Sequence, residues 1–131
     1  MSQQVIINEK VVLVIRILLG LGLVIFGLNK FMNFMPQPPA PEEGAAFLGQ
    51  LFHAGYIMNI AGVVYLAAGI SFLTNKFVPL LAIILFPILL NAFLYHARFD
   101  PAGITGAAVF TVLNILVMIA YKPAYNDLLK P

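Results

Sequence analysis

Cysteine is absent from the 131 residues of this chain. Its absence excludes disulfides, a thiol nucleophile, thiolate ligands for an iron–sulfur cluster and thioether attachment of haem. Redox chemistry, if the chain takes part in any, would need a bound cofactor or a quinone.

Charge is scarce as well: 9% of the residues are charged, whereas 62% are hydrophobic and the mean hydropathy is +0.99. This composition is typical of integral membrane proteins and not of soluble globular domains. A soluble protein with a large core is the alternative, but it would not need apolar runs of about twenty residues separated by short polar breaks. The basic residues are not clustered, so the net charge of +2 gives no sign of nucleic-acid binding.

Motifs for hydrolytic or metal chemistry are missing too. The sequence has no phosphate-binding loop, no zinc motif, no serine–histidine–acid set and no acidic metal cluster. We therefore expect no metal site, and we favour a protein without catalytic residues of its own.

What the chain does have is four apolar stretches in a single domain, 1–131. They predict membrane-spanning helices at residues 10–34, 55–73, 77–97 and 105–121. Residues 45–52 form an amphipathic stretch that is expected to lie along the membrane interface. The tight connection at residues 74–76 predicts an antiparallel return of the chain. The predicted fold is all-α, a membrane-embedded four-helix bundle with antiparallel, up-and-down connectivity.

Flanking charges predict how these helices are oriented. Four spans place both termini on one side, and the positive-inside rule assigns that side to the cytoplasm because it carries more basic residues. The N-terminus has no basic region ahead of a cleavage site, so we expect the first helix to be retained. The basic residues of the terminal side are Lys10, Lys76, Lys122 and Lys130, against Lys30 and Arg98 on the other side.

Small and polar residues share one stripe of the first helix. Arg16, Gly20 and Gly27 follow helical spacing, and small residues let helices approach closely within a membrane. Arg16 lies roughly 6 Å inside the span by the helical rise, so it either extends to the interface or points inward toward Asn114 or Tyr121. Asn114 belongs to a comparable seam on the fourth helix.

Polar residues within the spans are few, and they are the candidates for a binding site. Counting along the second and third helices from their connection brings two pairs to equal depth, Asn59 with Asn91 and His53 with His96. Pro87 is expected to kink the third helix and open a cavity beside Asn91. The candidate ligand-binding residues near this outward mouth are Asn29, Lys30, His53, Asn59, Asn91, His96 and Arg98.

Two interpretations of the outward mouth stay open. In one it is a polar pocket for a quinone headgroup or another small amphiphile, with a histidine hydrogen-bonded to a carbonyl. In the other, Asn59 and Asn91 form interhelical hydrogen bonds of ~1 kcal/mol each and the histidines lie in the headgroup region. Haem held by the two histidines is the least favoured, because axial ligands usually lie inside a bundle rather than at its rim.

Residues 16–31, R-x-L-L-G-L-x-x-x-x-F-G-L-N-K-F, resemble the opening helix of the DoxX-like family of small four-helix membrane proteins. In outline the resemblance covers the rest of the chain, with a loop that ends amphipathic, a second helix rich in glycine and alanine, a hairpin and a fourth helix that ends near a basic residue. Members of the family are associated with membrane oxidoreductase assemblies, including a thiosulfate:quinone oxidoreductase subunit, and related proteins act as assembly factors.

The resemblance implies an accessory, scaffold or assembly subunit of a complex in the bacterial cytoplasmic (inner) membrane. The alternative is a quinone-binding oxidoreductase subunit with its polar pocket near the outer membrane face. A transporter or channel is a third and weaker hypothesis, because four short helices with few polar residues enclose little. The expected partners are the lipid bilayer and either another membrane protein or further copies of the chain, and not nucleic acid.

Overall fold

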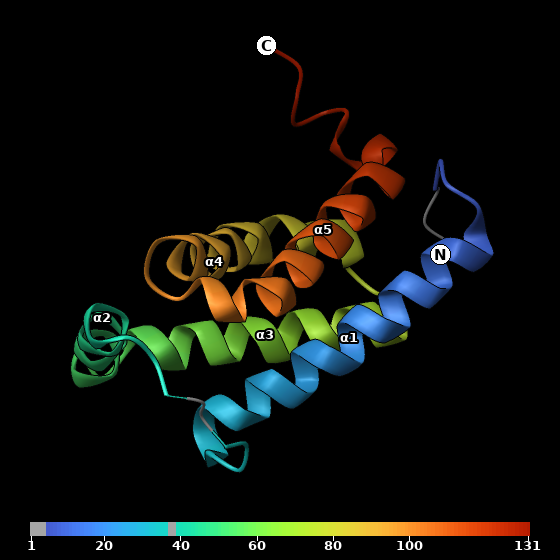
Figure 1. Cartoon of the computed structure of the whole chain (residues 1–131). Coiled ribbons are helices and arrows are strands. Elements are labelled where there is room, and N and C mark those ends of the chain that lie inside the picture. Colours follow the sequence, from blue (N-terminus) through green and yellow to red (C-terminus); the bar gives the residue numbers. More distant parts are fainter. Residues whose placement is uncertain (1–4, 37–38) are drawn as a thin grey trace.

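The computed structural model describes residues 5–36 and 39–131, which form helices and connecting turns. No strand occurs in these two ranges, and the predicted all-α class is confirmed. In chain order the elements are α1 (Glu9–Met32), α2 (Glu42–His53), α3 (Ile57–Thr74), α4 (Val78–Phe99), η1 (Pro101–Gly103), α5 (Ile104–Ala120) and η2 (Lys122–Tyr125), where η marks a 3₁₀ turn (Figure 1).

Four helical segments are long and apolar enough to cross a membrane. They are α1, α3, α4 and Pro101–Ala120, which joins η1 to α5. They have between 18 and 24 residues, which at 1.5 Å per residue gives about 27 to 36 Å and matches a hydrocarbon core of about 30 Å. The remaining helix, α2, has 12 residues. It lies at one end of the others and is seen nearly end-on in Figure 1, while α3 runs across the view.

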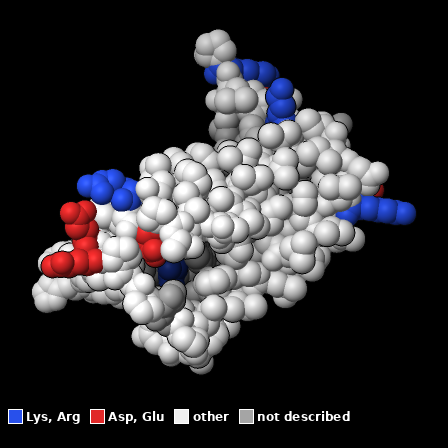
Figure 2. Space-filling view, in the orientation of Figure 1, with Lys and Arg blue, Asp and Glu red and all other residues white. Residues whose placement is uncertain are grey.

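The four long helices pack as two pairs. α1 makes its most extensive contacts with α3, and α4 makes its own with α5; contacts of α3 with α4 and of α1 with α5 join the pairs. The interior between them is apolar, with Leu19, Leu23, Phe72, Leu85 and Leu89 fully buried. In Figure 2 most charged groups lie toward the edges of the molecule, with one acidic and one recessed basic group beside a hollow left of centre, and the broad surface to the right of them is uncharged.

Close approach of α1 and α3 depends on glycines that face each other. A Cβ atom added to Gly69 would lie 3.0 Å from both the Gly20 carbonyl oxygen and the backbone nitrogen of Val24. A Cβ at Gly20 would in turn lie 3.1 Å from the Gly69 carbonyl oxygen. The two backbones are therefore in direct contact, as small residues allow in helix pairs within membranes.

Left-handed residues end two of the helices. Asn33 (φ 49°) follows α1 and Asn75 (φ 56°) follows α3, and asparagine adopts this conformation more readily than most residues. Phe77 (φ 60°) is also left-handed, which completes the tight turn into α4 at the expense of strain for a bulky side chain. α4 continues through Pro87, and neither of the two cavities described below includes this residue.

The molecule thus has two distinct ends. At the terminal end α1 begins, α3 turns into α4 and α5 stops, and the backbone nitrogen of Ile6 donates to the Ala120 carbonyl oxygen at 2.9 Å. At the α2 end α1 stops, α3 begins and α4 turns into η1, with α2 lying beside them (Figure 1).

Candidate functional site

All residues of the expected outward mouth lie in the α2 half of their helices. Asn29 and Lys30 are in the last turn of α1, Asn59 is in the first turn of α3, and His53 ends α2. Asn91, His96 and Arg98 belong to the C-terminal part of α4. The structure therefore brings these residues to one end of the molecule, and their side chains decide whether they form a site.

Asn29 and Lys30 each have a partner on a neighbouring segment. The buried Asn29 side chain accepts a hydrogen bond from the backbone nitrogen of Met35 at 2.8 Å, which fastens the chain after α1. The Lys30 ammonium lies 4.9 Å from the centre of the Tyr65 ring on α3, a cation–π contact that helps hold the end of α1 against α3. Both side chains therefore support the fold.

Asn59 and Asn91 do not form the interhelical pair that equal depth suggested. Asn59 is exposed and donates to the Gly55 carbonyl oxygen at 3.2 Å, within its own segment. Asn91 is exposed too, and it makes no hydrogen bond with any residue in the described ranges. The reason is the direction of the side chain around the axis of α4. Leu89 faces the interior, and Asn91, two positions further along the helix, points about 200° away from it.

The two histidines are not paired either. His53 is exposed and makes no hydrogen bond, ion pair or ring contact within the described parts of the chain. His96 has its Nδ1 atom 3.2 Å from the Asp100 carbonyl oxygen and 3.7 Å from Asp100 Oδ2. Its ring also lies against Gly103, where an added Cβ would be 2.6 Å from His96 Cε1. His96 therefore shapes the turn between α4 and η1, which gives no support to haem ligation by this pair.

α2 packs against α4 at this end, a contact that was not predicted from the sequence. Phe47 stacks on Tyr95 and Phe99 with ring centres 6.0 and 5.4 Å away. Gly44 allows this contact, because a Cβ there would lie 2.8 Å from the Tyr95 hydroxyl. That hydroxyl is buried and has no hydrogen-bond partner in the described residues. The sequence signal for this contact is the spacing of Gly44 and Phe47, which lie one helical turn apart at the start of the amphipathic stretch.

Arg98 adds an exposed ion pair to the same contact. Its Nη1 atom lies 3.6 Å from Glu43 Oε2, and both side chains are more than two-thirds exposed. Pairs of this kind contribute ~0–1 kcal/mol. Arg98 thus helps to place α2, and its charge stays in contact with solvent.

A second set of polar residues is buried at the terminal end. Arg16 is 8% exposed, and its Nη1 atom donates to the Phe72 carbonyl oxygen at 2.7 Å. Phe72 belongs to the last turn of α3, whose carbonyls lack helical partners and carry the negative end of the helix dipole. Arg16 therefore points inward, and its guanidinium caps α3. No carboxylate of the described residues lies within ion-pair distance of it.

Tyr121 and Asn114 extend this buried set across α5. The Tyr121 hydroxyl donates to Asn75 Oδ1 at 2.8 Å, and burial raises the pKa of Tyr121 while the nearby Arg16 charge opposes the shift. Asn114 is fully buried and donates from Nδ2 to the Ala82 carbonyl oxygen at 3.0 Å. We name Arg16, Asn75, Asn114 and Tyr121 the terminal cluster. It links all four long helices through bonds to backbone carbonyls and the Asn75 cap.

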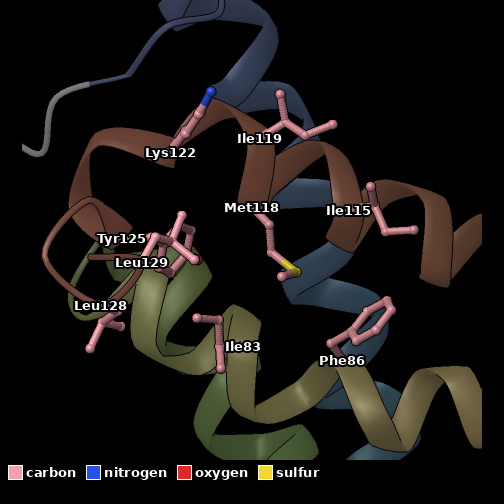
Figure 3. Close-up of a pocket in the computed structure, with 9 residues that line it drawn as sticks. All are labelled: Ile83, Phe86, Ile115, Met118, Ile119, Lys122, Tyr125, Leu128 and Leu129. Carbon is pink, nitrogen blue, oxygen red and sulfur yellow. The ribbon is translucent and has the colours of Figure 1, made fainter. Parts of the chain in front are cut away.

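Surface cavities occur at both ends of the described part of the chain. A shallow one of about 330 Å³ lies beside Tyr56 and Asn59 at the start of α3. A larger groove of about 470 Å³ runs between α4, α5 and the segment after α5 (Figure 3). Its lining is apolar except for Lys122 and the Tyr125 hydroxyl. Neither cavity contains a set of converging polar side chains, and the described residues hold no group of three metal-ligating side chains.

No family model matches the chain, and comparisons with curated proteins and with solved structures also gave no match. The resemblance of residues 16–31 to the DoxX-like family therefore rests on the sequence pattern alone.

Proposed function

We propose that this chain is an integral membrane protein of the DoxX-like kind, in which α1, α3, α4 and α5 cross the bacterial cytoplasmic membrane as a four-helix bundle. In this proposal it acts as a non-catalytic accessory, scaffold or assembly subunit of a membrane complex. Residues of the α2 end face outward and both termini lie in the cytoplasm.

The supporting observation is the distribution of polarity along the helices. The outward face of α1 is a continuous apolar stripe that runs along most of the helix. Large exposed apolar patches are unfavourable in water. α5 has a similar stripe. The exposed residues are Val11, Val14, Leu18, Leu21, Ile25 and Leu28 on α1 and Val109, Val112, Ile115 and Ile119 on α5. Apart from the buried Arg16, the charged side chains lie toward the ends of the helices or in the segments that connect them.

Charge asymmetry between the two ends supports the orientation. The terminal end has five basic and two acidic residues, and the α2 end has two basic and three acidic residues. Basic residues gather on the cytoplasmic side of membrane proteins. A reporter fused after Pro131 should be active only if it works in the cytoplasm, and a periplasmic signal would reverse the proposed orientation.

An accessory role is supported by the engagement of the polar side chains. Asn29, Asn59, His96 and Arg98 each contact a residue of their own or an adjoining segment, and the side chains of the terminal cluster bond to neighbouring helices or to the Asn75 cap. These contacts fix helices in place and leave apolar outer faces, such as the stripe of α1, as surface available to another membrane protein. A quinone-binding subunit remains the second candidate, because the buried Tyr95 hydroxyl is a donor without a partner among the described residues at the α2 end.

Purification in a mild detergent separates these two functions. We expect the wild-type chain to elute with a second membrane protein or as a defined oligomer, which light scattering and mass spectrometry of the peak would identify. Organic extraction and an absorption spectrum of the same peak should contain no stoichiometric quinone or haem. A stoichiometric quinone that is lost in Tyr95→Phe would favour the second candidate and contradict the accessory role.

A further inference from the structure

The groove between α4, α5 and the C-terminal segment has the dimensions of a small-molecule site. Its volume of about 470 Å³ falls within the ~300–1,000 Å³ typical of such sites. Figure 3 shows its walls, with Met118 directed between the two helices. The lining residues are Ile83 and Phe86 of α4, Ile115, Met118 and Ile119 of α5, and Lys122, Tyr125, Leu128 and Leu129 beyond α5.

The wall formed by the C-terminal segment is fastened to the helices. The Tyr125 hydroxyl donates to the Pro79 carbonyl oxygen at 2.7 Å, close to the start of α4. The backbone nitrogens of Leu128 and Leu129 donate to the Tyr125 carbonyl oxygen at 3.0 and 3.2 Å. Both leucine side chains are more than 70% exposed, so they present apolar surface beside the groove at the membrane boundary that the proposed topology implies.

The lining favours a flexible hydrocarbon chain over another helix. Helices within membranes approach each other through small residues, as Gly20 and Gly69 do here. The groove walls contain no glycine, alanine or serine, and apart from Lys122 they consist of large branched, aromatic and thioether side chains. A narrow, deformable chain can follow such a surface, whereas a helix would meet none of the small residues that allow close approach.

Lys122 supplies the only charge of the groove lining, and it lies at the more basic end of the molecule. A lysine at a membrane boundary keeps its apolar stem along the protein and its ammonium among the lipid headgroups. Basic residues on the cytoplasmic side of spanning helices attract anionic headgroups. Provided that the chain spans the membrane as proposed above, we infer that this groove binds one acyl chain of an anionic phospholipid, whose phosphate contacts Lys122.

Native mass spectrometry of the full chain in mixed micelles tests this site. The probes are palmitoyl-oleoyl phosphatidylglycerol and palmitoyl-oleoyl phosphatidylcholine, offered in equal amounts. Wild-type protein should retain one lipid with about a five-fold preference for phosphatidylglycerol, the effect expected of one basic residue beside an anionic headgroup. Lys122→Gln should lose the preference, while Lys10→Gln, which removes a lysine of the same end outside the groove, should keep it.

A second pair of variants tests the groove itself. Ile115→Trp should obstruct the groove and abolish retention of both lipids, whereas Val112→Trp, on an exposed position of α5 outside the groove, should retain them. Circular dichroism checks that the variants fold. If Ile115→Trp does not fold, the comparison of Lys122→Gln with Lys10→Gln still tests the lipid site. Equal retention of both lipids by the wild-type chain would overturn the site. Lipid that persists in Ile115→Trp, or a second polypeptide that this variant displaces, would overturn it as well.

Carbonate extraction of the membranes keeps this inference separate from the proposed function. A chain that resists extraction but retains no lipid would overturn the lipid site alone. A chain that carbonate releases would overturn the membrane-spanning placement, and the lipid site with it.

Discussion

The two ends of this molecule use their polar residues differently. At the α2 end the side-chain hydrogen bonds and ion pairs are exposed or local, such as Asn59 with Gly55, His96 with Asp100 and Arg98 with Glu43. At the terminal end they are buried and join segments far apart in the chain, such as Arg16 with Phe72 and Asn114 with Ala82. Buried hydrogen bonds between distant segments stabilise a fold more than exposed local ones. We therefore expect the terminal end to determine stability and the α2 end to tolerate substitution.

The largest difference should come from overpacking the α1–α3 contact at each end. Gly69→Leu places side-chain atoms against backbone atoms of Gly20 and Val24, so the helices must separate, which costs about 3 kcal/mol or more. Gly62→Leu meets chiefly the Phe31 ring, which can rotate away, and should cost about 1 kcal/mol. The free energy of unfolding in detergent, titrated with a denaturing detergent, measures both.

Two further positions of the same contact extend this test. Gly20→Leu and Gly27→Leu should both be more destabilising than Leu18→Ala, since Leu18 is 60% exposed on the outer face. Equal stability of the glycine variants and Leu18→Ala would contradict the close approach of α1 and α3.

The next difference concerns the two arginines. Arg16→Met removes a charged donor from the last turn of α3 and should destabilise the protein by ~2 kcal/mol, the usual value for a hydrogen bond to a charged group. Arg98→Met removes only an exposed ion pair and should cost less than ~1 kcal/mol. Thermal unfolding in detergent compares the two. If both variants unfold at the same temperature, the guanidinium of Arg16 does not contribute as a cap.

Tyr125 allows the terminal end to be weakened by pH. Burial raises the pKa of Tyr125 from 10.0 to about 12, so the folded protein keeps this proton at pH values where the unfolded chain has lost it. The hydroxyl bond to Pro79 therefore contributes fully below pH 10, and its contribution is lost as the pH rises from 10 to 12. Tyr125→Phe should cost about 1 kcal/mol at pH 8, and the gap to the wild type should narrow above pH 10.

Melting temperatures of the wild type and of Tyr125→Phe at pH 8 and pH 11.5 measure how the stability difference between them changes with pH. Titration of lysines and of other tyrosines affects both proteins alike and cancels in the comparison. A gap that stays constant over this range would show that Tyr125 keeps an ordinary pKa.

The helical class could be predicted from the sequence because length and hydropathy report on helices directly. Residues 16–31 contain both the outward apolar stripe and the glycines that contact α3, and both follow from helical spacing. The seating of α2 could be predicted only in part, since an amphipathic stretch indicates a surface helix without naming the residues that it covers. Tyr95 and Phe99 lie some fifty positions away from Phe47, and only the tertiary structure brings them together.

The candidate site was harder to predict, because depth and direction are separate quantities. Counting residues at 1.5 Å each gives the depth of Asn59 and Asn91, but the direction of a side chain advances by about 100° per residue and is fixed by packing. Asn29 shows a second reason: an asparagine near a helix end can bond to the backbone that follows it instead of to a ligand. Arg16 was predictable as a polar residue of the first span, while its partner on α3 required the structure.

The smallest expected effect is at Asn59 and Asn91, and it tests the comparison most directly. Both side chains are exposed, and Asn59 bonds only within its own segment, so each single change to leucine should alter stability by less than about 0.5 kcal/mol. The double variant should equal the sum of the two, because residues that share no contact are additive within ~0.3–0.5 kcal/mol. Denaturant titration of the wild type, both single variants and the double variant gives the coupling energy. A coupling of ~1 kcal/mol would mean that the two amides meet across α3 and α4 in the membrane, which would make the α2 end a second structural centre. If the wild type does carry quinone, against the expectation above, its loss in the double variant would assign these residues to a ligand pocket.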